Sequence, residues 1–326
     1  MQTDKVIIVT GASSGIGEAT SRLFARRGWA VVLAARSADK LQRIAEEIRA
    51  GGGQVLVVPT DVTVQEDVTA LVQRTCAHFG RIDVLLNNAG GGISGTVESL
   101  DLAQLEYIFK LNVLAPVAAL QAVAPIMKQQ NEGIIVNVSS LVEGIPVPYM
   151  SGYGASKAAL GYLSDAAAIE LDGFHIAVLK VLPGLTETNF DANLLAAEQA
   201  TTLEELFEKV SLLDVVPAAT VAEAIWNAVA SRRRQSYVTA QGRFLGRVTQ
   251  LAPEATQQVL KFAIKRYAPV AGTPRATSVG QDALKAGLAL IGVLAGVSAG
   301  YLLYRRARCC HSDGPPRSSL RPRRSE

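Results

Sequence analysis

The sequence predicts an α/β fold: a doubly wound, mostly parallel sheet of seven strands with helices on both faces, followed by a C-terminal helical extension. Short apolar runs alternate with helical patterns, as expected when crossover helices connect parallel strands. The composition is also globular, because 49% of the 326 residues are hydrophobic and 19% are charged. The runs expected to form strands are 5–9, 29–35, 54–59, 82–86, 133–138, 176–182 and 236–239.

A glycine-rich turn follows the first run. Residues 10–17 read TGASSGIG and precede a helix expected from Glu18 to Arg27. Strand, glycine turn and helix form the Rossmann-type dinucleotide-binding unit, in which the backbone approaches a pyrophosphate and helix N–H groups face its charge. The spacing Gly-x-x-x-Gly-x-Gly departs from the general motif, so an ordinary tight turn is the alternative. The predicted cofactor-binding residues here are Gly11, Ser13, Ser14, Gly15, Ile16 and Gly17.

The end of the second expected strand indicates which dinucleotide binds. An acidic residue at this place accepts hydrogen bonds from the ribose hydroxyls of NAD(H), and Ala35 cannot do so. Arg36 follows, and its planar guanidinium pairs well with a phosphate. The sequence therefore predicts NADP(H) as cofactor, with NAD(H) less favoured. The alternative for Arg36 is an exposed arginine at the start of a polar loop.

A tyrosine and a lysine four residues apart form the candidate catalytic group. If residues 153–163 are helical, Tyr153 and Lys157 share a face and lie about 6 Å apart along the axis. A nearby ammonium favours the phenolate, so we expect Lys157 to lower the pKa of Tyr153 from its ordinary value of about 10. Taken alone, such a pair is usually a solvated lysine beside a packed ring.

The motifs together resemble the short-chain dehydrogenase/reductase family over residues 3–245. Those that carry the resemblance are TGASSGIG at 10–17, Asn87-Asn88-Ala89-Gly90, Asn112, Ser140 and Tyr153-x-x-x-Lys157.

The resemblance implies a role for each polar residue. Tyr153 would be the acid/base, Lys157 would hold the nicotinamide ribose, and Ser140 would position the substrate oxygen. Asn112 would hold a water for proton relay, or else be a buried amide bonded to backbone. Ser139 is the rival of Ser140, which has the family's separation from Tyr153.

The resemblance also implies further cofactor contacts. Asp61 and Val62 would meet the adenine ring, although Asp61 is equally suited to cap a helix. The segment after the sixth expected strand would cover the nicotinamide and pyrophosphate. The residues added in this way are Asn88, Ala89, Gly90, Pro183, Gly184, Thr186 and Thr188.

The C-terminal part departs from the family core. We expect a core domain at 1–245, a helical extension and linker at 246–281, a hydrophobic helix at 282–305 and a basic disordered tail at 306–326. Residues 286–304 carry no charge and would span about 28 Å as a helix, which predicts membrane association. A buried dimerisation helix is the alternative.

Topology and location follow from the same segment. Arginines come directly after it, beside Cys309 and Cys310 as candidate acylation sites. Positive residues favour the cytoplasmic side, where an NADP(H)-binding domain also belongs, so an interfacial or re-entrant helix fits better than a spanning one. We expect a membrane-associated protein with its catalytic domain facing the cytoplasm, or a cytoplasmic one if the helix packs.

Composition excludes several functions. The net charge of +3 and the lack of a basic helix interleaved with aromatics give no support to a nucleic-acid partner, and the three cysteines have no metal-type spacing. The polar leader 1–5 predicts no signal peptide.

The expected function is NADPH-dependent oxidoreduction at a CH–OH or carbonyl group of an apolar small molecule. A catalytically silent NADP(H)-binding sensor, or another chemistry on this fold, is the alternative. The resemblance further implies a homo-oligomer.

Overall fold

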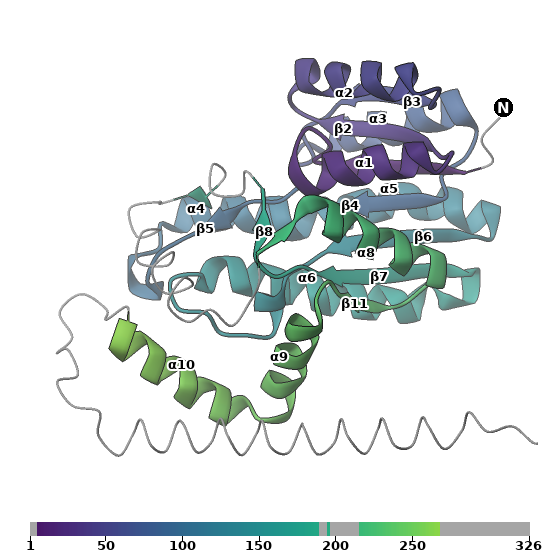
Figure 1. Ribbon diagram of the computed structural model, residues 1–326. Helices are drawn as coiled ribbons and strands as arrows, with labels where there is room; N and C mark the ends of the chain where they lie inside the picture. Colours follow the sequence, from purple (N-terminus) through teal and green to yellow (C-terminus); the bar gives the residue numbers. More distant parts are fainter. Residues whose placement is uncertain (1–4, 189–193, 196–214, 268–326) are drawn as a thin grey trace, which may run out of the picture. The chain divides into compact units, whose positions relative to one another are not determined.

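A parallel sheet of seven strands forms the centre of the fold (Figure 1). The structure, a computed structural model, describes residues 5–188, 194–195 and 215–267. The strands of this sheet are β1 (Val6–Thr10), β2 (Ala30–Ala35), β3 (Val55–Pro59), β4 (Val84–Asn87), β6 (Gly133–Val138), β7 (Ile176–Leu182) and β11 (Gln235–Tyr237).

The strand order is β11-β7-β6-β4-β1-β2-β3, and every neighbouring pair runs parallel. The predicted doubly wound sheet is confirmed, and each expected run overlaps a strand with ends shifted by no more than two residues. The order reverses between β1 and β4, which pair with each other, while β2 lies beyond β1 and β6 lies beyond β4. Ligands of such sheets bind beyond the carboxyl ends of the strands at this reversal.

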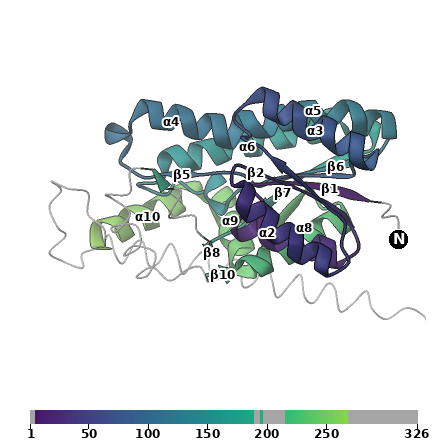
Figure 2. The same cartoon turned by 90° about the horizontal axis from the view of Figure 1, so that it is seen from above.

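Helices cover both faces of the sheet (Figure 2). On one face lie α1 (Gly15–Arg26), α2 (Ala38–Ala50) and α8 (Ala218–Ser231); on the other lie α3 (Gln65–Phe79), α5 (Ala115–Gln130) and α6 (Ser151–Glu170). Side chains alternate along each strand. In β1, Ile7 and Val9 enter the core under the first layer, while Val6 and Ile8 enter the core under the second.

Two helices differ in extent from their predictions. The first was expected from Glu18 but begins at Gly15, inside the glycine motif. The one carrying Tyr153 was expected over 153–163 and spans twenty residues. The remaining helices are α4 (Leu102–Phe109), α9 (Ala240–Leu251), α10 (Pro253–Tyr267), the π-helix η2 (Lys110–Leu114) and the 3-10 turns η1 (Val97–Ser99), η3 (Leu141–Glu143) and η4 (Asp172–Phe174). Short strands are β5 (Gly92–Ile93), β8 (Thr186–Glu187), β9 (Leu194–Leu195) and β10 (Val216–Pro217).

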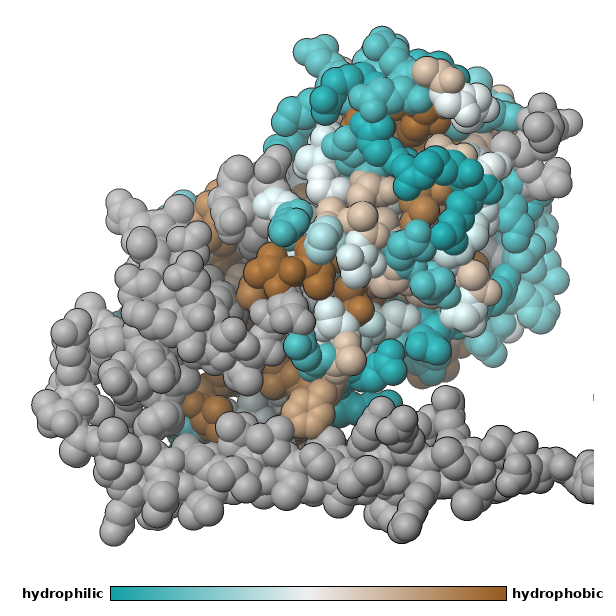
Figure 3. Space-filling model, in the orientation of Figure 1, coloured by the Kyte–Doolittle hydropathy of each residue, from teal (hydrophilic) through white to brown (hydrophobic). Residues whose placement is uncertain are grey.

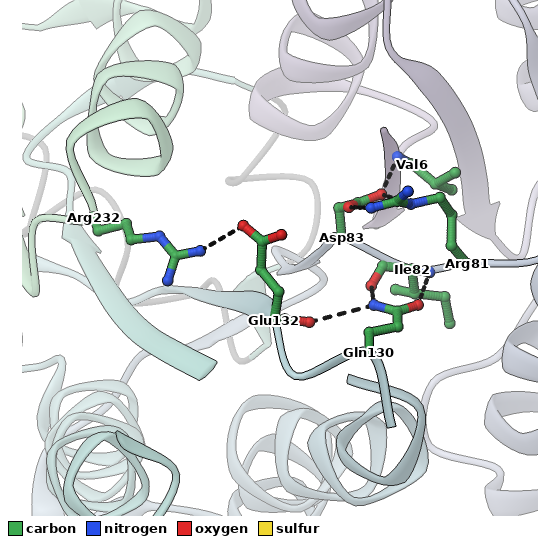
Figure 4. A network of polar contacts seen from close by, with 7 residues as sticks. All are labelled: Val6, Arg81, Ile82, Asp83, Gln130, Glu132 and Arg232. Carbon is green, nitrogen blue, oxygen red and sulfur yellow. Dashed lines mark hydrogen bonds and ion pairs between the residues drawn. The ribbon is translucent and has the colours of Figure 1, made fainter. Parts of the chain in front are cut away.

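A polar network fastens the amino ends of the strands, opposite the expected site (Figure 4). Asp83 accepts from the backbone N–H of Val6 at 2.7 Å and from Arg81 at 2.6 Å. Gln130 bonds both the N–H and the carbonyl of Ile82. Nearby, Arg232 pairs with Glu132 at 2.8 Å, and both side chains are about half exposed at 42% and 52%.

The chain divides into two compact units, residues 1–253 and 254–326. In the second unit the structure describes only the part of α10 up to residue 267, so the segments expected at 282–305 and 306–326, with Cys309 and Cys310, lie outside the described residues. Within the described ranges, one helical stretch, Leu102–Gln130, is long and apolar enough to cross a membrane. Nearly half of its most apolar window, 44%, is buried in the fold, so packing of α5 on the sheet explains its composition.

Candidate active site

The turn after β1 requires glycine, because of its backbone conformation and because other parts of the protein pack closely against it. Gly11 and Gly15 have positive φ angles of 65° and 55°, which side-chain-bearing residues rarely adopt. A Cβ on Gly11 would lie 2.8 Å from the amide nitrogen of Asn88, and one on Gly17 would strike the carbonyl of Gly11. Ser14 precedes α1 without capping it by its side chain. The Ser14 side chain therefore does not accept a hydrogen bond from the first N–H groups of α1. An anion-binding turn requires such N–H groups to be left for the anion.

Thr188 lies against this turn, although it is far away in sequence. A Cβ added to Gly15 would meet Thr188 Cγ2 at 3.0 Å. Thr186 donates from its hydroxyl to the carbonyl of Gly184 at 3.2 Å. The carbonyl of Pro183 accepts from the N–H of Leu141 at 3.0 Å, which fixes the end of β7 to the turn after β6. The structure thus gathers the Pro183–Thr188 segment beside the glycine turn.

Thr10 and Asn88 join the glycine turn to the end of β4. Thr10 Oγ1 accepts from the N–H groups of Asn88 and Ala89 at 3.0 and 3.1 Å, and it donates to the carbonyl of Leu86. In return, Asn88 Nδ2 donates to the carbonyl of Thr10 at 2.9 Å. Sequence reasoning missed Thr10, although a threonine that closes a strand before a glycine turn is a visible signal.

Arg36 and Asp61 lie at the ends of β2 and β3, apart from the tyrosine group. Arg36 is exposed and directly follows Ala35. Burial raises the pKa of Asp61, but hydrogen bonds from Thr63 and the charges of Arg36 and Lys110 outweigh it, so the net shift is downward. The carboxylate accepts from Thr63 N and Oγ1 at 2.9 and 2.7 Å. Asp61 does not cap α3, whose N-cap is Val64, so that alternative is excluded.

Tyr153 and Ser140 meet through a side-chain hydrogen bond. Tyr153 lies in the first turn of α6, and Ser140 is the N-cap of η3 directly after β6. Tyr153 is only 9% exposed. Burial raises the pKa of Tyr153 to about 12, against the opposing effect of the Ser140 hydrogen bond.

Lys157 lies one turn further along α6, under the ring of Tyr153. Its Nζ is 5.7 Å from the ring centroid and donates to the carbonyl of Val138 at 2.9 Å. Burial lowers the pKa of Lys157 to about 8, although the charge of Glu143 raises it. The prediction that Lys157 lowers the pKa of Tyr153 toward neutrality is therefore wrong when only the groups of the protein itself act on Tyr153. Desolvation of the phenol exceeds any stabilisation of the phenolate by the lysine.

Asn112 lies in the π-helix between α4 and α5 and is fully buried. Its amide nitrogen donates to the carbonyl of Gly91 and to Ser156 Oγ, both at 2.9 Å, and its oxygen accepts from the N–H of Gly91 at 3.0 Å. Both amide hydrogens are used, so the side chain is a buried amide bonded largely to backbone. A Cβ on Gly90 would lie 3.1 Å from Asn112 Oδ1 and 3.6 Å from Lys157 Nζ, so these residues border one small space.

The side chain of Ser139 has a carboxylate as its partner. Its hydroxyl donates to Glu143 Oε2 at 2.6 Å. The structure therefore brings together Asn112, Ser140, Tyr153 and Lys157, with Gly90 beside them, whereas Ser139 has a different partner. Glu143 itself was not predicted, because Lys180, which forms an ion pair with it, lies far away in sequence.

A comparison with protein families identifies the chain. The family model described as short chain dehydrogenase matches residues 5–199, more than half of the sequence. The chain belongs to the short-chain dehydrogenase family.

Relatives of this short-chain dehydrogenase include a Nostoc protein named ketoacyl reductase HetN, 37% identical over 182 residues, which are 56% of this chain and 63% of that protein. Among solved structures, a short-chain dehydrogenase/reductase from Burkholderia phymatum in complex with NAD is similar with a TM-score of 0.71 and 26% identity, covering 78% of this chain and 96% of the other. A short-chain dehydrogenase from Sphingobium yanoikuyae in complex with NADPH gives 0.63 and 28%, covering 84% and 99%.

The family and the geometry agree on a nicotinamide cofactor. The cradle formed by Gly11, Gly15 and Gly17, where an added Cβ would meet Asn88, Thr188 or backbone, suits the close approach of a pyrophosphate. The short-chain dehydrogenase is accordingly an oxidoreductase of the NAD(P)-dependent kind.

Proposed function

We propose that this short-chain dehydrogenase is an NADP(H)-dependent carbonyl reductase, in which Tyr153 exchanges a proton with the substrate oxygen. The observation that carries the proposal is the buried hydrogen bond between Ser140 and Tyr153, with Lys157 one helical turn beyond. Bound NADPH would supply the hydride. The name of the Nostoc relative, a ketoacyl reductase, supports the same reaction class.

The protein's residues divide the remaining work. Tyr153, whose pKa lies at about 12, is protonated near neutral pH and can give its proton to a carbonyl oxygen as charge develops there. Ser140 donates to the same oxygen and stabilises that charge. Lys157 offers its other ammonium hydrogens to ribose hydroxyls. Both amide hydrogens of Asn112 are used, so a relay water held by this residue would have to donate to one of its oxygens.

Preference for NADP(H) rests on the end of β2. Ala35 provides no carboxylate for a ribose diol, and the exposed guanidinium of Arg36 is free to approach a 2′-phosphate. One similar solved structure contains NAD and another contains NADPH, so the similar structures do not indicate which cofactor this chain prefers. The proposed preference therefore rests on Ala35 and Arg36.

An apolar substrate is supported by the residues next to Ser140. Val142 and Val147 are half-buried, and Ile145 and Met150 are buried at 7% exposure each. In the space-filling view, apolar surface is exposed beside the polar surface over α1 and α2 (Figure 3). The sequence further favours Phe190, Leu194, Leu206 and Phe207 as apolar walls of the substrate site. Leu194 lies in β9, paired with β5, and the other three lie outside the described residues.

Association of two copies is proposed through the outer face of α6. Tyr162 and Ile169 are 78% and 72% exposed and lie seven residues apart, so they share one helix face, and Leu114 at the start of α5 is 61% exposed. Exposed apolar surface of this kind marks an interface.

Membrane association through 286–304 stays a proposal. It would be supported if carbonate-washed membranes retained the full chain but not a chain that ends at residue 281.

The direct test of function is a reductase assay with purified protein. We expect NADPH oxidation with medium-chain aldehydes and ketones, and slower turnover with small polar sugars. Turnover of sugars alone would contradict an apolar substrate. Absence of NADPH oxidation with every carbonyl compound, in protein that binds NADPH, would overturn the proposed reaction.

A further inference from the structure

A cluster of three charged side chains lies directly behind the active-site turn. Lys180 Nζ contacts Glu143 Oε1 and Asp165 Oδ2, both at 2.8 Å. The side chains of Lys180 and Glu143 are only 6% and 15% exposed, whereas that of Asp165 is 54% exposed. The cluster joins three elements, since Lys180 comes from β7, Glu143 from η3 and Asp165 from α6.

A charge at the position of Lys180 requires explanation, because the rest of β7 is apolar and nearly all of it is buried. Burial by itself would lower the pKa of Lys180, but hydrogen bonds to Asp165 and Glu143 outweigh it, and the net shift is upward. Lys180 is therefore held as an ammonium. A buried pair of this kind seldom adds net stability over an apolar pair, so a role in the site is worth seeking.

The carboxylate of Glu143 packs closely against Gly161. A Cβ on Gly161 of α6 would lie 2.7 Å from the Glu143 carboxylate, so any larger residue there would displace it. Glu143 also closes the turn that Ser140 begins, since its N–H donates to the carbonyl of Ser140 at 3.1 Å. Its carboxylate thus lies against α6 and is fixed on the same turn as Ser140.

The same carboxylate reaches the catalytic residues by a second route. Glu143 Oε2 accepts from Ser139 Oγ at 2.6 Å, and Ser139 Oγ also lies 3.5 Å from the carbonyl of Lys157. Glu143 therefore contacts the residue before Ser140 through its side chain and Ser140 itself through its backbone, and Lys180 holds it from β7.

We propose that Glu143, held by Lys180, is a positioning residue of the reductase: it fixes the Ser139–Ser140 turn against Tyr153 and keeps a negative charge near the Lys157 ammonium. The inference rests on the proposed function, since it concerns the same site. Glu143 touches neither substrate nor cofactor in this account. It acts through Ser140 and Lys157.

The electrostatic part follows from the groups around Glu143. Lys180 faces it from β7, Asp165 and Lys157 belong to α6, and Tyr237 belongs to β11. Burial has the largest effect on both neighbours, since it lowers the pKa of Lys157 and raises that of Tyr237. The charge of Glu143 raises both pKa values, and Lys180, with Arg247 and Arg243 of α9, lowers that of Tyr237. Removal of the negative charge therefore lets Lys157 lose its proton at lower pH. In the proposed mechanism the Lys157 ammonium holds the ribose hydroxyls, so reduction slows when this ammonium is deprotonated. The alkaline limb of the pH–rate profile should therefore move to lower pH.

The decisive variant is Glu143→Gln, which keeps the shape and removes the charge. We expect kcat for carbonyl reduction to fall about 10-fold with little change in the KM for the carbonyl, because Ser140 acts mainly on the developing charge. The alkaline limb should shift to lower pH, because the charge of Glu143 raises the pKa of Lys157. NADPH affinity, measured by fluorescence across the same pH range, should weaken at correspondingly lower pH. Glu143→Asp should restore part of each change.

Two further variants keep the test decisive. Glu132→Gln removes a carboxylate from the distant pair with Arg232 and should leave rate, limb and affinity unchanged. If Glu143→Gln folds poorly, the double variant Glu143→Gln/Lys180→Met removes both buried charges and should fold while keeping the shifted limb.

The outcomes separate the two proposals. A folded Glu143→Gln protein with the parent kcat, pH profile and pH-dependent NADPH affinity would overturn the positioning role and leave the reductase intact. Failure of the unmodified protein to reduce any carbonyl, with NADPH binding retained, would overturn the proposed function instead.

Discussion

The side-chain amide of Asn88 donates to the carbonyl of Thr10 at 2.9 Å, so the end of β4 is fastened to the glycine turn after β1. A second bond from the same nitrogen reaches the carbonyl of Gly11 at 3.3 Å. The cofactor cradle is therefore braced by a residue that a Cβ on Gly11 or Gly17 would strike.

Asn88→Ala should weaken both the fold and the cofactor site. Loss of these bonds leaves carbonyls near the turn without a partner, which costs about 1–3 kcal/mol in the free energy of unfolding. Urea denaturation and NADPH titration measure the two effects. Asn227→Ala, at an exposed position of α8, is the control and should change neither. Unchanged NADPH affinity in Asn88→Ala would show that the brace does not shape the cradle.

Arg36→Ala should reduce the affinity for NADPH and spare that for NADH. A lost charge-assisted contact to phosphate amounts to about 1.5–3 kcal/mol, or roughly 10- to 100-fold in Kd. Ala35→Asp should favour NADH further, because a carboxylate accepts from ribose hydroxyls and repels the phosphate. Arg49→Ala, exposed at the end of α2, serves as the control. Equal loss for both nucleotides in Arg36→Ala would contradict the assignment of NADP(H).

The rate of carbonyl reduction should be constant near neutral pH and fall above about pH 8. Both Tyr153 and Lys157 must be protonated, and with pKa values of about 12 and about 8 the lysine loses its proton first as the pH rises. Steady-state kcat/KM measured from pH 6 to 10 tests this. A rate of reduction that rises from pH 7 to 9 would contradict the assignment of Tyr153 as the proton donor and of Lys157 as an ammonium.

Glutamate in place of Tyr162 or Ile169 should lower the oligomeric state in solution. A charge on the exposed apolar face of α6 would have to be desolvated between two copies. Sedimentation velocity compares the variants with Leu102→Glu, which alters an equally exposed residue on α4. An oligomer that persists in both α6 variants would place the interface elsewhere.

The positions of the strands along the chain and the glycine turn were predictable because their signals are local. Apolar runs such as 5–9 and the glycines at 11, 15 and 17 depend on neighbours in sequence and on backbone geometry. The start of α1 was missed because Gly15 has little helix propensity, and only the turn geometry makes it the first helical residue.

The electrostatics of the site were not predictable from spacing. Tyr153 and Lys157 share a helix face as expected, yet the pKa of each is governed by burial, which a sequence does not reveal. The Glu143–Lys180 pair was missed for a related reason. Its members are 37 residues apart, and a lysine in an apolar strand makes sense only once its partners are seen. The π-helix at Asn112 likewise has no sequence signal that we recognise.

The most direct measurement is NADPH-dependent carbonyl reduction by Tyr153→Phe, compared with Tyr162→Phe, which removes the same hydroxyl from an exposed position of α6. Loss of a general acid predicts a fall in kcat of about 100- to 10,000-fold in Tyr153→Phe, with NADPH affinity retained. Tyr162→Phe should match the parent protein. A Tyr153→Phe protein that reduces the carbonyl at the parent rate would contradict the account.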